Sequence, residues 1–274
     1  MTKKESRLSK SFNVYFSVIN HRTFISVFIS ILATWLSYRY KLIFNLDLTL
    51  ISVAVVFPLV FSLGSAFQRR EKALEHLGRV KGALSSIKYL FSFSKKITES
   101  EKEKIYKEVH NVKTALIVYL HSESDDKEKL NLSINKIQEF VEKHRDSIGR
   151  SLSSKIYRLM RDVIMGLENT ISIKTHRTPK SIRAYCELFI YVFPFFYAPT
   201  LIKNIEYQDI LLGDIIASPN ITFISSRFDL IIYLLNIILS FFLITLFNVQ
   251  EQIENPFDQD GIDDIKLGNF ELDY

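Results

Sequence analysis

The residues that most often carry catalysis are few in this chain and are not spaced for it. No two histidines lie three or four residues apart, so a helix cannot present two of them to one metal ion; they are His21, His76, His110, His121, His144 and His176. The chain has no Gly-rich phosphate loop, no H-E-x-x-H and no G-x-S-x-G. Cys186 is the single cysteine, which excludes an internal disulfide and a cysteine metal site. The sequence therefore predicts a protein that is not an enzyme and requires no cofactor.

Arg183 and Glu187 form an ionisable pair at the start of an apolar stretch. Their i, i+4 spacing places them on one face of a helix. Ionisable groups at membrane depth usually face the interior of a helix bundle or a water-filled path. Alternatively, Arg183 reaches the lipid headgroups and Glu187 pairs with it. Both interpretations stay open at this point.

A second charged feature is the acidic segment near the C-terminus. Five carboxylates surround one proline and one glycine there: Glu254, Asp258, Asp260, Asp263 and Asp264. Clustered carboxylates on a turn suit a hard cation such as calcium, but the twelve-residue ligand spacing of an EF-hand is missing. We therefore favour an acidic surface loop that docks on the basic middle segment over a metal site.

The apolar residues fall into blocks of the length that spans a bilayer. A helix of about 20 apolar residues crosses the hydrocarbon core. The sequence predicts four such spans, at 23–44, 48–67, 184–202 and 230–249. Together with the segments between them, these spans predict an all-α membrane protein.

The basic residues orient these spans. Thirty of the 35 lysines and arginines lie before Thr23 or between Arg69 and Arg183. Because basic residues concentrate on the cytoplasmic side, both termini and the middle segment are expected in the cytoplasm of a cell-membrane protein. The net charge is only +5, and the basic residues alternate with acidic ones along the middle segment. This pattern does not favour a nucleic-acid partner.

The middle segment, 69–180, and the tail, 250–274, are expected to form a helical cytosolic part of a single domain. Steps of three and four residues among apolar positions predict that the helix of the second span continues to about Phe93. Thr98 to Glu101 is a capping box that opens a helix ending near His121. Three further boundaries follow from the pattern: Asp125 or Asp126 begins the next helix, Gly149 with Arg150 ends it, and Pro179 breaks the chain after a helix over 152–174.

One face of the second span carries Val53, Phe57 and Phe61 at every fourth position. Such a stripe is most often a helix-packing or lipid-contact face. Around a symmetry axis, however, apolar side chains can form a constriction that gates ions by dewetting. Pro58 lies in the middle of this span and leaves a carbonyl unpaired, which protein or water must satisfy.

Three groups of residues resemble the bestrophin family and its bacterial members. Glu254-Asn255-Pro256-Phe257 followed by an Asp-rich run is similar to the family's signature after its last span. Phe57-Pro58, Phe61 and then Arg69 resemble the family's neck helix and the arginine beyond it. Ala184-Tyr185, Tyr191 and Pro194-Phe195 resemble the entry to its third span. The resemblance covers essentially the whole chain.

The resemblance implies a homopentameric ion channel in a lipid bilayer, with a central pore that passes small monovalent ions such as chloride. It implies a pore neck at Val53, Phe57 and Phe61, and charges at the pore mouth at Arg69 and Glu187. It also implies a second constriction deep in the cytosolic part, carried over to Ser181, Ile182 and Arg183, where the family usually has Ile-Pro. Arg183 would favour anions there.

The chain departs from the family in ways that keep alternatives open. Arg70 and Glu71 replace an aromatic pair, and Asp258 replaces a glycine. Family members that bind calcium do so through acidic tail residues, which makes calcium possible here at Asp260, Asp263 and Asp264. Because family members differ in ion selectivity, a monovalent-cation channel is one alternative. A membrane-anchored interaction scaffold is the other.

Overall fold

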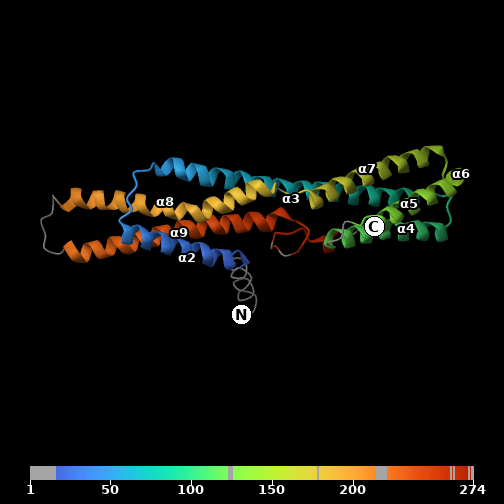
Figure 1. Ribbon diagram of the computed structural model, residues 1–274. Helices are drawn as coiled ribbons and strands as arrows, with labels where there is room; N and C mark the ends of the chain where they lie inside the picture. Colours follow the sequence, from blue (N-terminus) through green and yellow to red (C-terminus); the bar gives the residue numbers. More distant parts are fainter. Residues whose placement is uncertain are drawn as a thin grey trace, which may run out of the picture. The chain divides into compact units, whose positions relative to one another are not determined.

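The computed structural model describes residues 17–122, 126–177, 179–213, 221–259, 261, 263–270 and 272, and for 206–213, 221–228 and 269 the backbone alone. These residues form helices and, within those ranges, no strand. The helices are α2 (His21–Tyr40), α3 (Leu48–Ser92), α4 (Glu99–His121), α5 (Glu128–Lys143), α6 (Arg145–Ile148), α7 (Arg150–Thr175), α8 (Lys180–Gly213), α9 (Ile221–Glu254) and the 3₁₀ turn η1 (Leu267–Asn269) (Figure 1). The all-helical fold predicted from the sequence is confirmed.

The chain divides into two compact units. The first unit comprises Met1–Ala66 and Thr178–Glu251, and the second comprises Phe67–Arg177 and Gln252–Tyr274. The first unit holds α2, the first part of α3, α8 and most of α9. The second holds the remainder of α3, α4 to α7 and the tail.

Among the residues that the structure describes, three segments have helices long and apolar enough to cross a membrane, which indicates a membrane protein. They lie in Leu48–Ser92, Arg150–Ile205 and Asp229–Glu254, and they contain the predicted second, third and fourth spans. The predicted first span corresponds to α2, which is not among them. Its many serines and threonines lower its hydropathy, so a span there stays a prediction.

The bounds of α2 differ from the predicted 23–44. Asn20 caps its start, because the Oδ1 atom of Asn20 accepts hydrogen bonds from the N–H groups of Arg22 and Thr23 at 3.0 and 3.3 Å. The helix ends at Tyr40, since Lys41 adopts the left-handed conformation with φ 51°. Leu42 to Phe44 therefore do not extend it.

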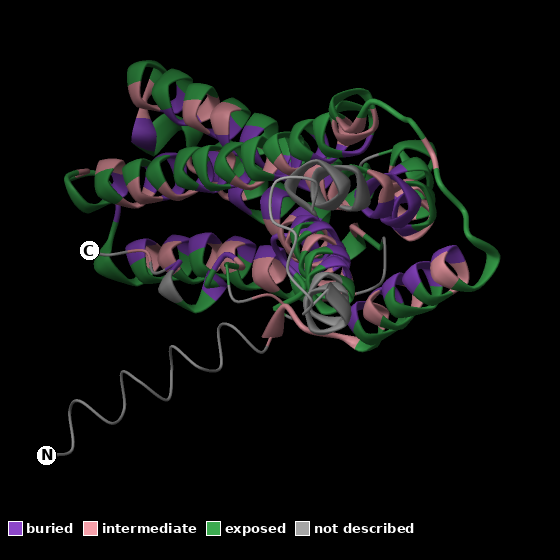
Figure 2. Cartoon of the chain, turned by 90° about the vertical axis from the view of Figure 1, so that its left-hand side faces the viewer, coloured by how far each residue is buried: buried purple, intermediate pink, exposed green. Residues whose placement is uncertain are grey.

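The helix α2 buries its polar face and exposes its apolar one. Its buried residues are small, mostly hydroxyl-bearing side chains: Thr23, Ser26, Ser30, Ala33, Thr34 and Ser37. Phe24 and Phe28 are instead 70% and 65% exposed. Figure 2 shows such divided faces along the helices. Small polar residues facing a helix partner and large apolar ones facing outward are typical of a helix in lipid.

The core of the first unit joins three helices. Val55 and Leu59 of α3 pack with Ile190 of α8 and with Ile244 and Phe247 of α9, and each is at most 3% exposed. This packing uses one face of α3. It leaves the opposite face of the same segment outside this core.

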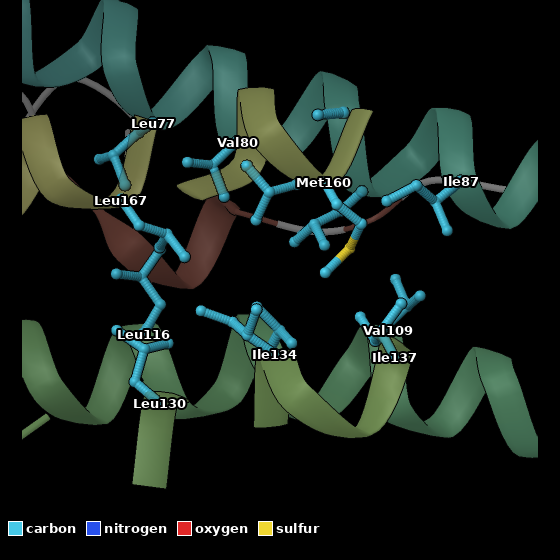
Figure 3. Close-up of a cluster of buried hydrophobic side chains, with 14 of the residues drawn as sticks. Leu77, Val80, Ile87, Val109, Leu116, Leu130, Ile134, Ile137, Met160 and Leu167 are labelled. Carbon is cyan, nitrogen blue, oxygen red and sulfur yellow. The ribbon is translucent and has the colours of Figure 1, made fainter. Parts of the chain in front are cut away.

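The second unit has an extended apolar core. Leucine, isoleucine and valine side chains from α3, α4, α5 and α7 meet in it, among them Leu77, Val109, Ile137 and Leu167 (Figure 3). The tail contributes Phe257, which is fully buried. The tail is therefore held on the second unit by apolar packing.

Local signals determine most helix boundaries of the second unit. Glu101 Oε2 accepts a hydrogen bond from the Thr98 N–H at 2.9 Å, which confirms the capping box of α4. Asp126 Oδ1 accepts from the Glu128 N–H at 2.9 Å at the start of α5, whereas Asp125 lies outside the described residues. The helix α3 ends at Ser92, one residue from the predicted Phe93.

Candidate functional site

The predicted pore-neck residues form an exposed apolar stripe on α3. Val53, Phe57 and Phe61 are 54%, 59% and 62% exposed. The rings of Phe57 and Phe61 contact each other edge to face, with centroids 4.4 Å apart. The core of the first unit uses the face that carries Val55 and Leu59, so the stripe lies outside that core. It is available to line a pore, to contact lipid or to meet a second copy.

Pro58 lies inside α3, as predicted, and removes one backbone donor from the helix. The side chain of Ser62, one turn further on, is 4% exposed. Within the described part of the chain, its hydroxyl has no hydrogen-bond partner. This part of α3 thus contains polar groups that the described chain leaves unsatisfied.

The predicted aperture residues Ser181 and Ile182 lie in the first turn of α8, in the first unit. They line a cavity of about 610 Å³ whose other walls are Pro58, Phe61, Ser62, Ser65, Pro179 and Tyr185. Ser181 and Ile182 thus lie near Phe61, because the start of α8 packs beside the first part of α3. Their role as a second constriction stays a prediction.

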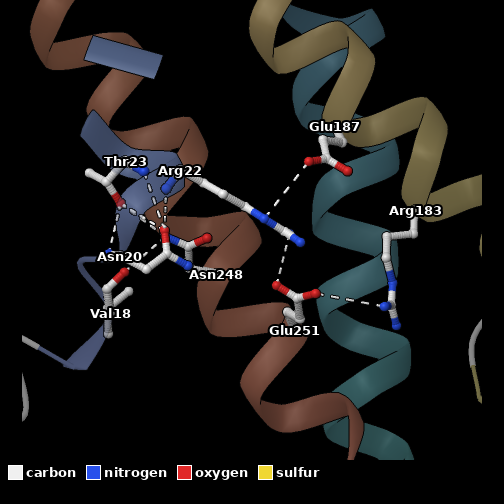
Figure 4. A network of polar contacts seen from close by, with 8 residues as sticks. All are labelled: Val18, Asn20, Arg22, Thr23, Arg183, Glu187, Asn248 and Glu251. Atoms are coloured by element: carbon white, nitrogen blue, oxygen red, sulfur yellow. Dashed lines mark hydrogen bonds and ion pairs between the residues drawn. The ribbon is translucent and has the colours of Figure 1, made fainter. Parts of the chain in front are cut away.

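Of the two interpretations left open, the one in which Glu187 pairs with Arg183 does not hold, because each pairs with another side chain (Figure 4). Arg183 Nη1 lies 3.7 Å from Glu251 Oε1, and Glu187 Oε1 lies 3.9 Å from Nε of Arg22. Arg22 also contacts Glu251, with Nη1 and Oε2 at 3.0 Å (Figure 4). Two arginines and two carboxylates from α2, α8 and α9 therefore form one charged cluster. Glu187 is paired with Arg22 of the same chain in this cluster. Its role as a charge at the pore mouth stays a prediction.

Asn248 connects the same region to the start of α2. Its Nδ2 atom donates to the Val18 carbonyl at 2.9 Å, to Thr23 Oγ1 at 3.0 Å and to Asn20 Oδ1 at 3.2 Å (Figure 4). Asn248 lies inside the span predicted at 230–249 and was not among the predicted site residues. The signal was an amide side chain in an otherwise apolar block, which needs a polar partner.

Arg69, the predicted charge at the pore mouth, is held within the second unit. Its Nη2 atom donates to the Ile173 carbonyl at 2.6 Å. Burial lowers the pKa of Arg69; the carboxylate of Glu254 opposes this effect and Arg177 adds to it. The guanidinium remains charged, since arginine does not deprotonate in proteins, and it supports the contact between α3 and α7.

The tail contacts the middle segment through a backbone group, and a docking of its carboxylates on basic side chains stays a prediction. The Asp263 carbonyl accepts a hydrogen bond from Arg70 Nε at 2.6 Å. Asp264 Oδ2 accepts from the Gly261 N–H at 2.8 Å, which closes a turn. Asp260 lies outside the described residues, and among the residues searched no three His, Cys, Asp or Glu side chains form a metal-sized group. Calcium at Asp260, Asp263 and Asp264 stays a prediction.

Comparison with known proteins gives a clear result for the fold. The chain resembles a bacterial bestrophin homologue from Klebsiella pneumoniae, with a TM-score of 0.69 and 14% identity over 91% of this chain and 93% of that one. It resembles a single-substitution variant of a bacterial bestrophin homologue from the same organism with a TM-score of 0.70, at the same identity and coverage. Another crystal structure, described only as that of a membrane protein variant, matches at 14% identity over 94% of both chains, with a TM-score of 0.68.

No protein-family model matches the sequence. No curated protein matches it either. The fold is therefore bestrophin-like on the strength of the structural comparison, as the tail and neck motifs predicted.

Proposed function

We propose that this protein is a homopentameric ion channel of the cell membrane that passes small anions such as chloride passively through a central pore. The observation that carries the proposal is the exposed stripe of Val53, Phe57 and Phe61 on a bestrophin-like fold. An aqueous environment would penalise these three side chains, whereas a symmetric neck or a bilayer would not. Conduction in this proposal needs no catalysis.

The stripe suits a neck because of its chemistry. Apolar side chains around a narrow axis disfavour continuous water and so raise the barrier for ions. The edge-to-face contact of Phe57 with Phe61 joins two successive helical turns into one apolar surface. Five copies of α3 arranged around one axis would close this surface into a ring.

The proposal includes a topology with both termini and the helices of the second unit in the cytoplasm. The charge asymmetry of the sequence supports this orientation.

Calcium is proposed only as a regulator at Asp260, Asp263 and Asp264. Chelation with EGTA during a flux measurement tests that role separately from conduction.

The test is ion flux into liposomes that contain the purified protein. A double variant, Phe57→Ala with Phe61→Ala, removes two apolar rings from the stripe and is expected to raise flux severalfold, because a wider and less apolar neck lowers the dewetting barrier. Phe28→Ala is the matched control, since Phe28 is similarly exposed but lies on α2. Unchanged flux and selectivity in the double variant would contradict the neck assignment.

Reversal potentials in a sodium chloride gradient distinguish the anion channel from a monovalent-cation channel. We expect a reversal potential near that of chloride. A reversal potential near that of sodium would agree with an ion channel but would contradict anion selectivity. Absence of any flux, with a monomeric protein in detergent, would favour the interaction scaffold.

A further inference from the structure

A cavity on the outer surface of the second unit lies between α3 and α7. Its volume of about 490 Å³ is within the range of small-molecule sites in proteins. On the inner side of these helices, Ile87 of α3 and Met160 of α7 point into the apolar core (Figure 3). Tyr89, which lines the cavity, is instead 57% exposed. The cavity therefore opens to the outside of the unit and is not a void in its core.

Apolar side chains form most of the lining of this cavity. Leu90 of α3 and Leu159 of α7 line it and also pack partly against the core. The ring of Tyr89 lies beside that of Phe93, one helical turn further on, with centroids 4.6 Å apart. Phe93 is 67% exposed, so the apolar surface continues beyond the cavity. A contiguous exposed apolar surface of this kind indicates a place where a ligand or a partner binds.

Two basic side chains of α7, Lys155 and Arg158, line the same cavity. Their i, i+3 spacing places them on one face of the helix, where both can reach one ligand. Within the described part of the chain, neither has a carboxylate partner. Asp162, the nearest acidic residue along α7, has its Oδ1 atom 3.9 Å from Nη2 of Arg79 and 3.6 Å from Nη2 of Arg161. The cavity therefore carries two positive charges that the described chain leaves unpaired.

These features define the chemistry of a ligand. A guanidinium and an ammonium together favour a carboxylate, which Arg158 can bind through two parallel hydrogen bonds. The apolar lining favours a hydrocarbon chain attached to that carboxylate, because binding removes the chain and the lining from water. A small inorganic anion would use only the charges, and an uncharged hydrocarbon would use only the apolar lining.

From these observations we infer that the cavity between α3 and α7 binds a single-chain carboxylate, an anion of the fatty-acid type. Lys155 and Arg158 bind the carboxylate, and Tyr89, Leu90 and Leu159 contact the chain. The inference is independent of the proposed function, since a ligand site in the second unit is compatible with a channel and with a scaffold alike.

The test is photo-cross-linking of the full chain, in lipid nanodiscs, to a decanoate analogue with a diazirine on its chain. Mass spectrometry is expected to locate the cross-link on α3 or α7, close to Tyr89 or Leu159. Excess decanoate should compete with the probe. Acetate lacks the chain and decanol lacks the carboxylate, so neither should compete at the same concentration. Cross-links confined to the apolar spans, or equal competition by decanol, would overturn the inference.

The charges are tested by the double variant Lys155→Gln with Arg158→Gln. Both side chains are exposed, so the variant should fold. The decanoate concentration that halves the cross-link should rise about tenfold, because hydrogen bonds between charged groups are lost. Arg150→Gln is the matched control, since Arg150 is an exposed basic residue of the same helix that is not among the residues lining the cavity. An unchanged concentration in the double variant would contradict the assignment.

Tyr89→Ser tests the other explanation of the apolar surface, in which a second copy of the chain covers it. The substitution removes an exposed ring and keeps both charges. We expect decanoate to compete more weakly, while the number of subunits, measured by native mass spectrometry, stays that of the parent protein. A change in the number of subunits would identify the surface as a subunit interface and would overturn the inference.

Discussion

At the residue scale, Gly166 shows how closely the helices of the second unit approach. A Cβ atom at Gly166 would lie 2.7 Å from Val80 Cγ2 and 3.1 Å from the His76 carbonyl oxygen. Both distances are shorter than a normal van der Waals contact, so α3 and α7 touch through this position. A glycine is required here by space, not by its backbone angles.

Gly166→Ala is therefore expected to destabilise the second unit. Overpacking costs about 1–3 kcal/mol, and this exceeds the gain of up to about 1 kcal/mol from replacing a helical glycine. Thermal unfolding measures the change, and Gly78→Ala is the control because a Cβ there meets nothing within 4 Å. Gly78→Ala should be neutral or stabilising. Equal effects of the two substitutions would mean that α3 and α7 are not in contact at Gly166.

Glu101 is the residue with the clearest expected pH dependence. The backbone N–H of Thr98 and then its hydroxyl lower the pKa of Glu101 below the usual 4.5, and His144 Nε2, 3.0 Å from Oε1, adds to this. A carboxyl whose pKa is lower in the folded state stabilises the fold above its unfolded pKa. This stabilisation is lost as the pH falls through the lowered, folded value.

The melting temperature of Glu101→Gln should consequently fall less between pH 7 and pH 3 than that of the parent protein. The amide cannot ionise, so the variant is less stable than the parent at pH 7 and differs less from it at pH 3. The control is Glu103→Gln on the exposed face of the same helix. If the parent and Glu101→Gln lost stability in parallel over this range, the capping carboxylate would not be the titrating group.

At the element scale, α2 is fixed by polar contacts that are unusual in a soluble bundle. Asn236 of α9 is fully buried and donates to the Ser30 carbonyl at 3.1 Å and to Thr34 Oγ1 at 2.9 Å. Together with Asn248, it attaches α9 to the small-residue face of α2. In lipid, such contacts substitute for the hydrophobic effect in holding helices together.

Asn236→Leu is expected to weaken this attachment. Side-chain hydrogen bonds between membrane helices contribute about 0.6 kcal/mol on average and at most about 1.7 kcal/mol, so a modest loss of thermal stability in detergent is predicted. Thr245→Val is the control, because Thr245 Oγ1 bonds only carbonyls of its own helix among the contacts described. A more stable Asn236→Leu protein would indicate that α2 is held by apolar contacts instead.

Local elements were predictable where the signal lies in neighbouring residues. The capping box at Thr98 and Glu101, the break at Pro179 and the continuation of α3 to Ser92 all follow from contacts within a few positions. Partners far apart in sequence were not predictable. Arg22 and Glu251 are separated by 229 positions, so nothing local indicates that they displace the Arg183–Glu187 pair. The position of Ser181 beside Phe61 likewise depends on how α8 packs.

At the scale of the whole molecule, the link between the fold and the proposed function is an apolar face of α3 that is exposed in the single chain. The first unit buries Val55 and Leu59 and exposes Val53, Phe57 and Phe61 on the same helical segment. In the proposed channel, several chains meet along this face. The proposed conduction therefore depends above all on the symmetry of the assembly.

The most direct measurement is a cryo-electron microscopy structure of the full chain in lipid nanodiscs. We predict five copies, with Phe57 and Phe61 of each α3 facing one shared axis and closing it to an apolar constriction. A monomer or dimer, or an oligomer whose Phe57 and Phe61 point toward lipid, would contradict the proposed channel.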